Sequence, residues 1–328
     1  MPCTERMMNK VISILIPIYN EGRSIAKLYE ELEKVTSSLK AYDFQYVFVD
    51  DGSKDDSCSV LAYLAKNDEK MTIIELSRNF GKEVAVTAGM HNVIGDAVII
   101  MDADLQHPPA VIPEFIKHWE QGYDIVATKR TNFEKRSICK RLASHAFYKL
   151  MSIISDVDMV SQTTDFRLVD KKVINLFNSF TERNRMVRGI IDWMGFKKTY
   201  IEFEAPERFA GHSVYGYRKL ISLAVNSITS FSSFPLKVTG YLGLIITIFS
   251  GLRIVMIVID KLTYNMGNFT LLGLFMMLNT FLTGLVLIGL GLIALYIAQI
   301  HVEVINRPLY IVKNITRGTH QALSDDKT

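Results

Sequence analysis

The stretch DAVIIMDADLQHPP, Asp96–Pro109, joins a short apolar run to two carboxylates that stand two residues apart. The run is rich in β-branched residues, which favours a buried strand, and Asp102 and Asp104 follow where that strand should end. Such a pair can hold a metal ion, act as acid and base, or cap the helix that PPAVIPEFIKHW predicts. The neighbouring segments of the chain bear on this choice.

Four further segments within the first 130 residues have the same strand-like character: Val11–Ile16, Tyr46–Asp50, Met71–Leu76 and Asp124–Lys129. Segments of helical length lie between them, and SIAKLYEELEKVTSSL begins at Ser24, a residue suited to an N-cap. This alternation predicts an α/β fold with a doubly wound, mostly parallel sheet. Such sheets bind ligands beyond the carboxyl ends of their strands.

Polar residues follow the first, second and fourth predicted strands and should meet at one edge of the sheet. They are Pro17, Tyr19, Asn20, Glu21, Asp50, Asp51, Asp102, Asp104 and Gln106. The motifs GxGxxG and GxxxxGK[ST] are absent from the sequence, which excludes the usual dinucleotide and P-loop sites. A divalent cation held by carboxylates can neutralise a diphosphate instead, so the metal interpretation gains over the capping one.

The composition describes a folded protein without a bulk nucleic-acid function. The chain has 328 residues, of which 49% are hydrophobic and 22% charged. A formal charge of +3 is too small to predict nucleic acid as a partner. Cys3, Cys58 and Cys139 are far apart and lack CxxC spacing, which disfavours a disulfide framework or a zinc site. The apolar run VISILIPI is too short for a signal peptide, so we expect this part in the cytoplasm.

Two long apolar runs, Val238–Ile259 and Leu271–Ile300, predict membrane spans, because roughly 20 residues cross a bilayer. Lys237 precedes the pair and Arg307 follows it, so both flanks are expected on the cytoplasmic side. The predicted organisation is a catalytic domain over residues 1–214, juxtamembrane amphipathic helices over 215–236, the two spans within 237–301, and a cytoplasmic tail over 302–328.

Seven motifs in order, followed by the two apolar runs, resemble the family 2 glycosyltransferases of GT-A fold. The motifs are PIYNEG (17–22), VDDGSKDDS (49–57), SRNFGKEVAVTAGM (77–90), DADLQHPP (102–109), DFRLVD (165–170), ERNRMVRG (182–189) and RFAGHSVY (208–215). Within that family the chain resembles the polyprenyl-phosphate glycosyltransferases, which include dolichol-phosphate mannose synthases and bactoprenol glucosyltransferases. The resemblance covers nearly the whole chain.

The resemblance implies a nucleotide sugar at the first two strand ends, and the residues it assigns to the nucleotide are Pro17, Tyr19, Glu21 and Asp51. It also implies that Asp102 and Asp104 contact the diphosphate through Mg²⁺ or Mn²⁺, with Gln106 as a third ligand. A cation there would stabilise the charge that grows on the leaving nucleoside diphosphate. The implied reaction is one inverting displacement at the anomeric carbon.

A basic segment, Lys129–Arg141, follows the fifth predicted strand. Charge runs are commonly solvated surface, yet a polyprenyl phosphate needs cations near the membrane, and arginine binds phosphate bidentately. Arg130 and Arg208 match phosphate-contacting arginines of the family and are assigned to the catalytic set. A phosphate with a second pKa of about 6 is already largely deprotonated at neutral pH, which weakens the need for a general base. Asp165 is the residue expected to act as a base or an orienting group.

The sequence departs from the family pattern at three positions. Gln162 and Thr164 stand where an aspartate and a glycine commonly precede DFRL, and Val214 replaces the lysine expected in GxSKY. Because the DADLQ motif is intact, we expect an active enzyme of altered specificity.

Together these features predict transfer of one sugar, from UDP-glucose or UDP-N-acetylglucosamine, to a polyprenyl phosphate such as undecaprenyl phosphate. The lipid-linked sugar would serve cell-envelope glycan modification, and the enzyme would sit in the cell membrane with its catalytic domain on the cytoplasmic face. Expected partners are the donor, the acceptor lipid, the bilayer, a second copy of the chain, a flippase and a second glycosyltransferase. Two alternatives stay open: a catalytically impaired membrane scaffold and a processive polysaccharide synthase.

Overall fold

The computed structural model describes residues 9–131, 163–183, 185–204 and 271–318, with a few isolated positions between 245 and 259. The chain forms two compact units. The first comprises Met1–Lys149, Val157–Val214 and Arg307–Thr328, and the second comprises Leu150–Asp156 and Tyr215–Asn306.

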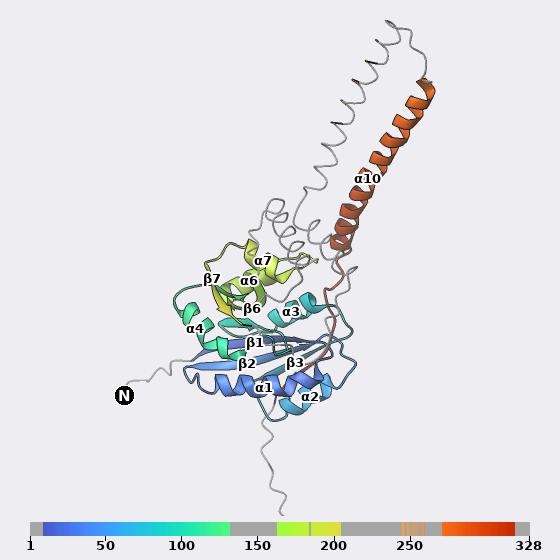
Figure 1. The fold of residues 1–328 in the computed structure, drawn as a ribbon. Coiled ribbons are helices and arrows are strands. Elements are labelled where there is room, and N and C mark those ends of the chain that lie inside the picture. Colours follow the sequence, from blue (N-terminus) through green and yellow to red (C-terminus); the bar gives the residue numbers. More distant parts are fainter. Residues whose placement is uncertain are drawn as a thin grey trace, which may run out of the picture. The chain divides into compact units, whose positions relative to one another are not determined.

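A sheet of eight strands, counted over the described residues, forms the centre of the first unit (Figure 1). The strands are β1 (Lys10–Ile18), β2 (Tyr42–Asp50), β3 (Met71–Leu76), β4 (Ala97–Ile100), β5 (Ile125–Arg130), β6 (Thr163–Asp170), β7 (Lys198–Phe203) and β8 (Val312–Arg317). Their order is β7-β5-β6-β4-β1-β2-β3-β8. Strand β1 pairs in parallel with β2 and β4, β2 with β3, and β5 with β7, whereas β6 and β8 are antiparallel to their neighbours. The predicted mostly parallel α/β sheet is confirmed.

Helices cover both faces of this sheet, as in a doubly wound fold. One face packs against α1 (Gly22–Thr36), α2 (Ser57–Ala65) and α4 (Ile112–Glu120), the last preceded by the 3₁₀ turn η1 (Pro109–Val111). The opposite face packs against α3 (Lys82–Met90), α6 (Lys171–Ser179) and α7 (Val187–Trp193).

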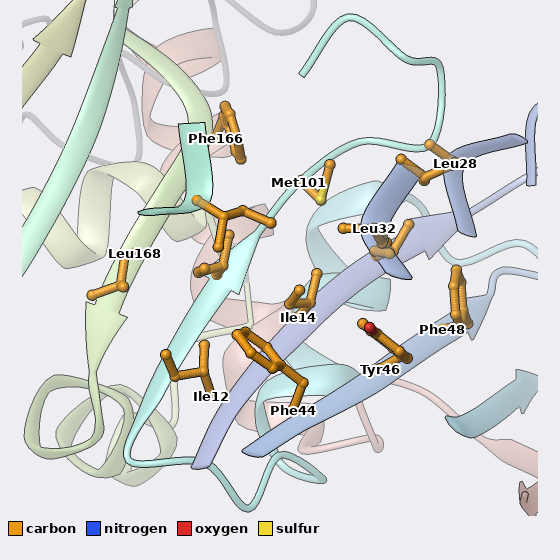
Figure 2. Packing of buried hydrophobic residues seen from close by; sticks show 14 of the residues in the cluster. Ile12, Ile14, Leu28, Leu32, Phe44, Tyr46, Phe48, Met101, Phe166 and Leu168 are labelled. Atoms are coloured by element: carbon orange, nitrogen blue, oxygen red, sulfur yellow. The ribbon is translucent and has the colours of Figure 1, made fainter. Parts of the chain in front are cut away.

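The apolar core explains why the first two strands are almost continuously hydrophobic. Ile12 and Ile14 of β1 pack with Phe44 of β2 and Leu32 of α1 on one face (Figure 2), and Leu15 packs on the other. Each of these side chains is at most 9% exposed. A strand covered on both faces has to be apolar at successive positions, which is the pattern that VISILI shows.

Helix α1 begins earlier than expected. Its N-cap is Glu21, so the prediction of Ser24 as the N-cap is wrong by three residues. The loop after β2 supplies the reason, because Ser57 Oγ accepts a hydrogen bond from Glu21 N–H and Asp55 Oδ2 accepts one from Gly22 N–H. These acceptors satisfy the first backbone donors of the helix, and the cap comes from another part of the chain.

The second unit contains a long apolar helix, α10 (Leu271–Ile305), of 35 residues. Its segment Phe281–Ile305 is long and apolar enough to cross a membrane. The second predicted span, Leu271–Ile300, therefore lies within a helix that is long enough to cross a membrane. The first, Val238–Ile259, lies mostly outside the described residues and stays a prediction, although its described positions, such as Leu252 and Met256, are helical.

Strand β8 is an element that the sequence analysis did not predict, within the segment expected as a tail. It follows α10 and pairs antiparallel with β3, with Thr72 opposite Arg317 and Glu75 opposite Asn314. Ser77 N–H also donates to the Ile311 carbonyl at 2.9 Å. The chain thus returns from the apolar helix to the edge of the eight-stranded sheet.

Candidate active site

The sheet order brings the predicted strand ends together. Strands β4, β1 and β2 are adjacent and parallel, so DADLQ, PIYNEG and VDDGS follow their carboxyl ends on the same edge. Strand β5 runs in the same direction as β4 because β6 is antiparallel to both, and Arg130 at its end reaches this edge as well. The predicted convergence of polar strand ends is confirmed.

Strand β6 contributes its amino end to the same edge, because it runs against β4. Ile100 pairs with Arg167, so continuing the register by two residues places Asp165 beside Asp102. This antiparallel pairing is how DFRLVD, which begins 63 residues after Asp102, reaches the carboxylates of DADLQ.

Lys82, the first residue of α3, joins these carboxylates. Its Nζ lies 2.6 Å from Asp102 Oδ1 and 2.8 Å from Asp165 Oδ2. Burial alone would lower the pKa of Lys82, but the two carboxylates outweigh that effect and hold the pKa above its usual value. Lys82 is a functional candidate that the sequence analysis missed. Its place at the start of α3, after the loop that follows the third strand, was the available signal.

Two arginines also stabilise the charge on Asp165. Burial would raise the pKa of the Asp165 carboxyl, but Lys82, then Arg188 and Arg167, hold it well below its usual range. Arg167 is 1% exposed, donates to the Thr164 carbonyl at 3.2 Å, and has its Nη1 3.9 Å from Asp192. Arg188 donates to the Thr163 carbonyl at 3.0 Å. Asp165 is therefore an anion at neutral pH, fixed within a network of cations.

The DADLQ loop is held in an uncommon conformation. Leu105 has a φ of +61°, in the left-handed region, and Gln106 N–H donates to Asp104 Oδ1 at 3.1 Å. Asp104 itself is 7% exposed. A strained non-glycine residue between two candidate ligands is typical of loops that fix functional groups.

His107 binds the backbone of this loop, and the sequence analysis did not single it out. Its Nδ1 accepts a hydrogen bond from Asp102 N–H at 2.9 Å, and its ring stacks on Phe166 with centroids 4.9 Å apart. Burial lowers the pKa of His107, so the ring is neutral at physiological pH, as its acceptor role at Nδ1 requires. His107 orients Asp102 through the backbone.

The residues at this edge fit a hard divalent cation. Over the described residues there is no group of three or more histidine, cysteine, aspartate or glutamate side chains that could hold a metal. Two carboxylates, Asp102 and Asp104, are nevertheless the usual protein share of a Mg²⁺ or Mn²⁺ site that takes its other ligands from phosphate and water. Asp102 already engages a cation in the form of Lys82. The assignment of Gln106 as a third ligand stays a prediction.

A pocket of about 480 Å³ opens over the ends of β1, β2 and β3. The residues that line it are Tyr19, Asp50, Gly52, Ser53, Lys54, Cys58, Glu75, Leu76, Ser77, Arg78, Asn79 and Lys313. Tyr19, one of the four residues assigned to the nucleotide, is 44% exposed here. Its neighbour Asn20 has a φ of +56° and is anchored by its N–H to Ser53 Oγ at 2.9 Å.

Asp51 has a clear structural role. Its two carboxylate oxygens accept hydrogen bonds from Phe80 N–H at 2.7 Å and Gly81 N–H at 2.8 Å, and the residue is 2% exposed. Burial raises the pKa of this carboxyl, partly offset by the two N–H donors. Asp51 therefore fixes the loop that carries Arg78 and leads to Lys82, and direct contact with a nucleotide stays a prediction, as it does for Pro17 and Glu21.

The remaining predicted residues are only partly described. Arg130 is half-buried at the end of β5, next to Lys129, whose Nζ lies 4.4 Å from the centre of the Tyr200 ring. Thr164, a departure from the family pattern, shares a hydrogen bond of 2.6 Å with the Thr128 hydroxyl. Arg208, Gln162 and Val214 lie outside the described residues.

Comparison with known proteins places this site in a family. The family described as "Glycosyl transferase family 2" matches residues 13–177. This range includes the carboxyl ends of β1 to β5 and the whole of β6. The chain belongs to glycosyltransferase family 2. It is a glycosyltransferase, and its mixed, mostly parallel sheet is that of the GT-A fold.

Several relatives match nearly the whole chain. Glycosyltransferase YkcC of Bacillus subtilis (strain 168) is 38% identical over 92% of this chain and 93% of its own length. The SfII prophage-derived bactoprenol glucosyl transferase of Shigella flexneri is 39% identical over 94% of this chain and 99% of its own. Among solved structures, mannosyl-3-phosphoglycerate synthase from Rubrobacter xylanophilus is similar over 68% of this chain and 73% of its own, with 18% identity and a TM-score of 0.49.

Proposed function

We propose that this glycosyltransferase moves a single sugar, in one inverting step, from a nucleoside diphosphate sugar to a membrane polyprenyl phosphate. A pocket, a pair of carboxylates and an arginine follow one another along one edge of the sheet, and this observation carries the proposal. The pocket lies over β1–β3, the carboxylates Asp102 and Asp104 follow β4, and Arg130 ends β5. A donor can bind along the first two, and an anionic acceptor can approach from the third.

Glucose is the sugar we propose, with UDP-glucose ahead of UDP-N-acetylglucosamine as the donor. The support is the set of relatives named bactoprenol glucosyl transferase, at 38–39% identity over at least 92% of this chain. Undecaprenyl phosphate is the acceptor that we propose on the same grounds.

The chain's own residues can carry the reaction without a general base. A phosphate acceptor is already deprotonated at neutral pH, so its oxygen attacks the anomeric carbon while the bond to the nucleoside diphosphate breaks. Asp165 is bound to Lys82 and flanked by arginines, an arrangement that suits orientation of Lys82 better than proton abstraction. Lys82 then stands beside the site of the leaving diphosphate and can donate to it.

Asp102 and Asp104, with Gln106, would hold Mg²⁺ or Mn²⁺ on the donor. When bound there, the cation supplies electrostatic stabilisation of the leaving diphosphate. His107 and the strained Leu105 keep the two carboxylates in place, so the loop is ordered before the donor arrives. Arg130, with Arg208, would bind the acceptor phosphate.

The return of the chain to the sheet supports two membrane spans. Strand β8 pairs with β3, so the residues after α10 lie on the same side of a membrane as the catalytic sheet. A chain that leaves and returns to one side must cross an even number of times. If α10 is one crossing, the apolar run Val238–Ile259 is the second. We place the catalytic unit on the cytoplasmic face, with residues 215–236 along the membrane surface.

The test incubates membranes that contain the full chain with a panel of labelled nucleotide sugars, polyprenyl phosphate and Mg²⁺ or Mn²⁺. Label should enter an organic-soluble lipid with one donor, and Asp104→Ala should abolish the signal. Asp43→Ala is the matched control, because Asp43 is exposed at the far end of β2. Metal-dependent nucleotide binding without any lipid-linked product would refute the proposal and favour a membrane scaffold. A growing polymer would favour a processive synthase.

A further inference from the structure

One residue of the nucleotide pocket comes from an unexpected part of the chain. Lys313 belongs to β8, which follows the apolar helix α10, yet it lines the same pocket as Tyr19 and Arg78. The pocket therefore has a wall that lies outside the matched family region of residues 13–177. A charged side chain in such a wall can contact a bound nucleotide.

The order of strands gives the direction of a bound donor. The carboxylates that would hold the diphosphate follow β4, and the strands beyond it are β1, β2, β3 and β8 in that order. Because the pocket lies on this side of β4, we expect a nucleoside attached to that diphosphate to extend over β1 and β2, with its base toward β3 and β8. Neighbouring strands are about 4.8 Å apart, so β3 is roughly 14 Å from β4.

Two side chains of opposite charge lie at the end of the pocket formed by β3 and β8. Glu75 of β3 and Lys313 of β8 approach to 3.7 Å between Oε2 and Nζ, and their side chains are 23% and 69% exposed. Both line the pocket. A carboxylate only accepts hydrogen bonds and an ammonium only donates them, so the pair presents one acceptor next to one donor.

We propose that Glu75 and Lys313 read the base of the donor nucleotide. Uracil, thymine and guanine present a ring N–H next to a carbonyl, so Glu75 can accept from the N–H while Lys313 donates to the carbonyl oxygen. When the ribose holds the base in that same orientation, cytosine and adenine present a ring nitrogen acceptor to Glu75 and an amino group to Lys313, which places acceptor against acceptor and donor against donor. Unsatisfied polar groups make that mismatch costly. The pair therefore selects bases with the N–H and carbonyl edge.

The experiment measures binding of UDP, GDP, CDP and ADP, with Mn²⁺, to the full chain in detergent by isothermal titration calorimetry. For the wild type, UDP or GDP should bind at least about tenfold more tightly than CDP and ADP, as expected for hydrogen bonds to charged groups. Lys313→Met should reduce the UDP to CDP affinity ratio by about tenfold. Glu75→Gln should reduce it too, because an amide can present either a donor or an acceptor.

The ratio is the deciding quantity, because loss of any nearby positive charge weakens all four anionic nucleotides alike. Arg317→Met is the matched control, since Arg317 is a cation of the same strand, four residues further on, and does not line the pocket. Its ratio should equal that of the wild type. Melting temperatures without nucleotide should be unchanged for Lys313→Met, because this side chain is 69% exposed.

Two results would overturn base reading by this pair. One is wild-type protein that binds CDP or ADP as tightly as UDP and GDP. The other is an unchanged ratio in both Lys313→Met and Glu75→Gln.

Because this inference rests on the nucleotide-sugar donor proposed above, sugar transfer to lipid is measured on the same preparations. Transfer by the wild type with an unchanged ratio in the variants overturns base reading alone. A ratio that depends on Lys313, without any lipid-linked product, supports base reading and overturns the transfer function alone.

Discussion

Gly52, in the loop after β2, should tolerate no larger residue. Its φ is +70°, and a Cβ at this position would lie 2.6 Å from the Arg78 carbonyl carbon and 2.7 Å from Asn79 N. Both neighbours are backbone atoms of the loop that lines the pocket, so they cannot move aside as a flexible side chain could. Gly52→Ala therefore combines backbone strain with a steric overlap.

A second glycine, Gly195, allows the backbone strain to be measured apart from the steric overlap. Gly195 has a φ of +69°, but a Cβ at this position would have no described atom within 4 Å, so Gly195→Ala carries the backbone strain alone. That strain costs about 1 kcal/mol, and the overlap at Gly52 adds about 1–3 kcal/mol. The Gly195→Ala melting temperature should fall by about 2–4 °C, and that of Gly52→Ala at least about twice as far.

The assay is thermal unfolding of the full chain in detergent, followed by UDP titration with Mn²⁺. Gly52→Ala should also weaken UDP binding, because Arg78 and Asn79 must shift, whereas Gly195→Ala should leave it unchanged. Equal losses of melting temperature in the two variants would refute a close approach of Gly52 to the Arg78 backbone.

Three further predictions concern the site and the membrane. Lys82→Met removes the ammonium that pairs with Asp102, so Mn²⁺ should bind at lower concentration, as measured by electron paramagnetic resonance. Sugar transfer should fall roughly tenfold or more. Unchanged or weaker Mn²⁺ binding would contradict competition between Lys82 and the metal for Asp102. Burial, with Asp50 beside the thiol, raises the pKa of Cys58 to about 12. In a Cys3→Ser, Cys139→Ser background its alkylation should be very slow at pH 7.5 and rise about tenfold per pH unit toward pH 10, and fast labelling at pH 7.5 would contradict this. In a cysteine-free chain, Tyr264→Cys should be labelled from outside intact cells and Asn314→Cys only after permeabilisation, and labelling of both from one side would contradict two spans.

The sequence was sufficient for the strands that lie close together along the chain. Strands β1 to β5 were predicted from short β-branched runs, and the polar residues after β1, β2 and β4 meet because parallel strands share their carboxyl edge. The carboxylates Asp102 and Asp104 were found for the same reason. Local pattern and strand direction were enough for this part of the site.

Sequence reasoning named Asp165 but missed Lys82 beside it and strand β8, because these depend on contacts between distant segments. Asp165 reaches Asp102 through the antiparallel pairing of β6, and Lys82 joins both because α3 begins at that edge. Strand β8 is six residues long and its burial pattern is mostly exposed, so it has little apolar alternation of its own. It forms because the edge of β3 offers unpaired backbone groups, which no local pattern in VKNITR reveals.

The most direct test of single-sugar transfer uses the purified full chain in lipid nanodiscs that contain undecaprenyl phosphate. With Mn²⁺ and UDP-glucose, mass spectrometry should show one lipid product that carries a single hexose, with none formed by Asp104→Ala and a normal yield from Asp43→Ala. Absence of this product with every nucleotide sugar, or a ladder of products with several sugars, would contradict the central claim of single-sugar transfer to a lipid phosphate.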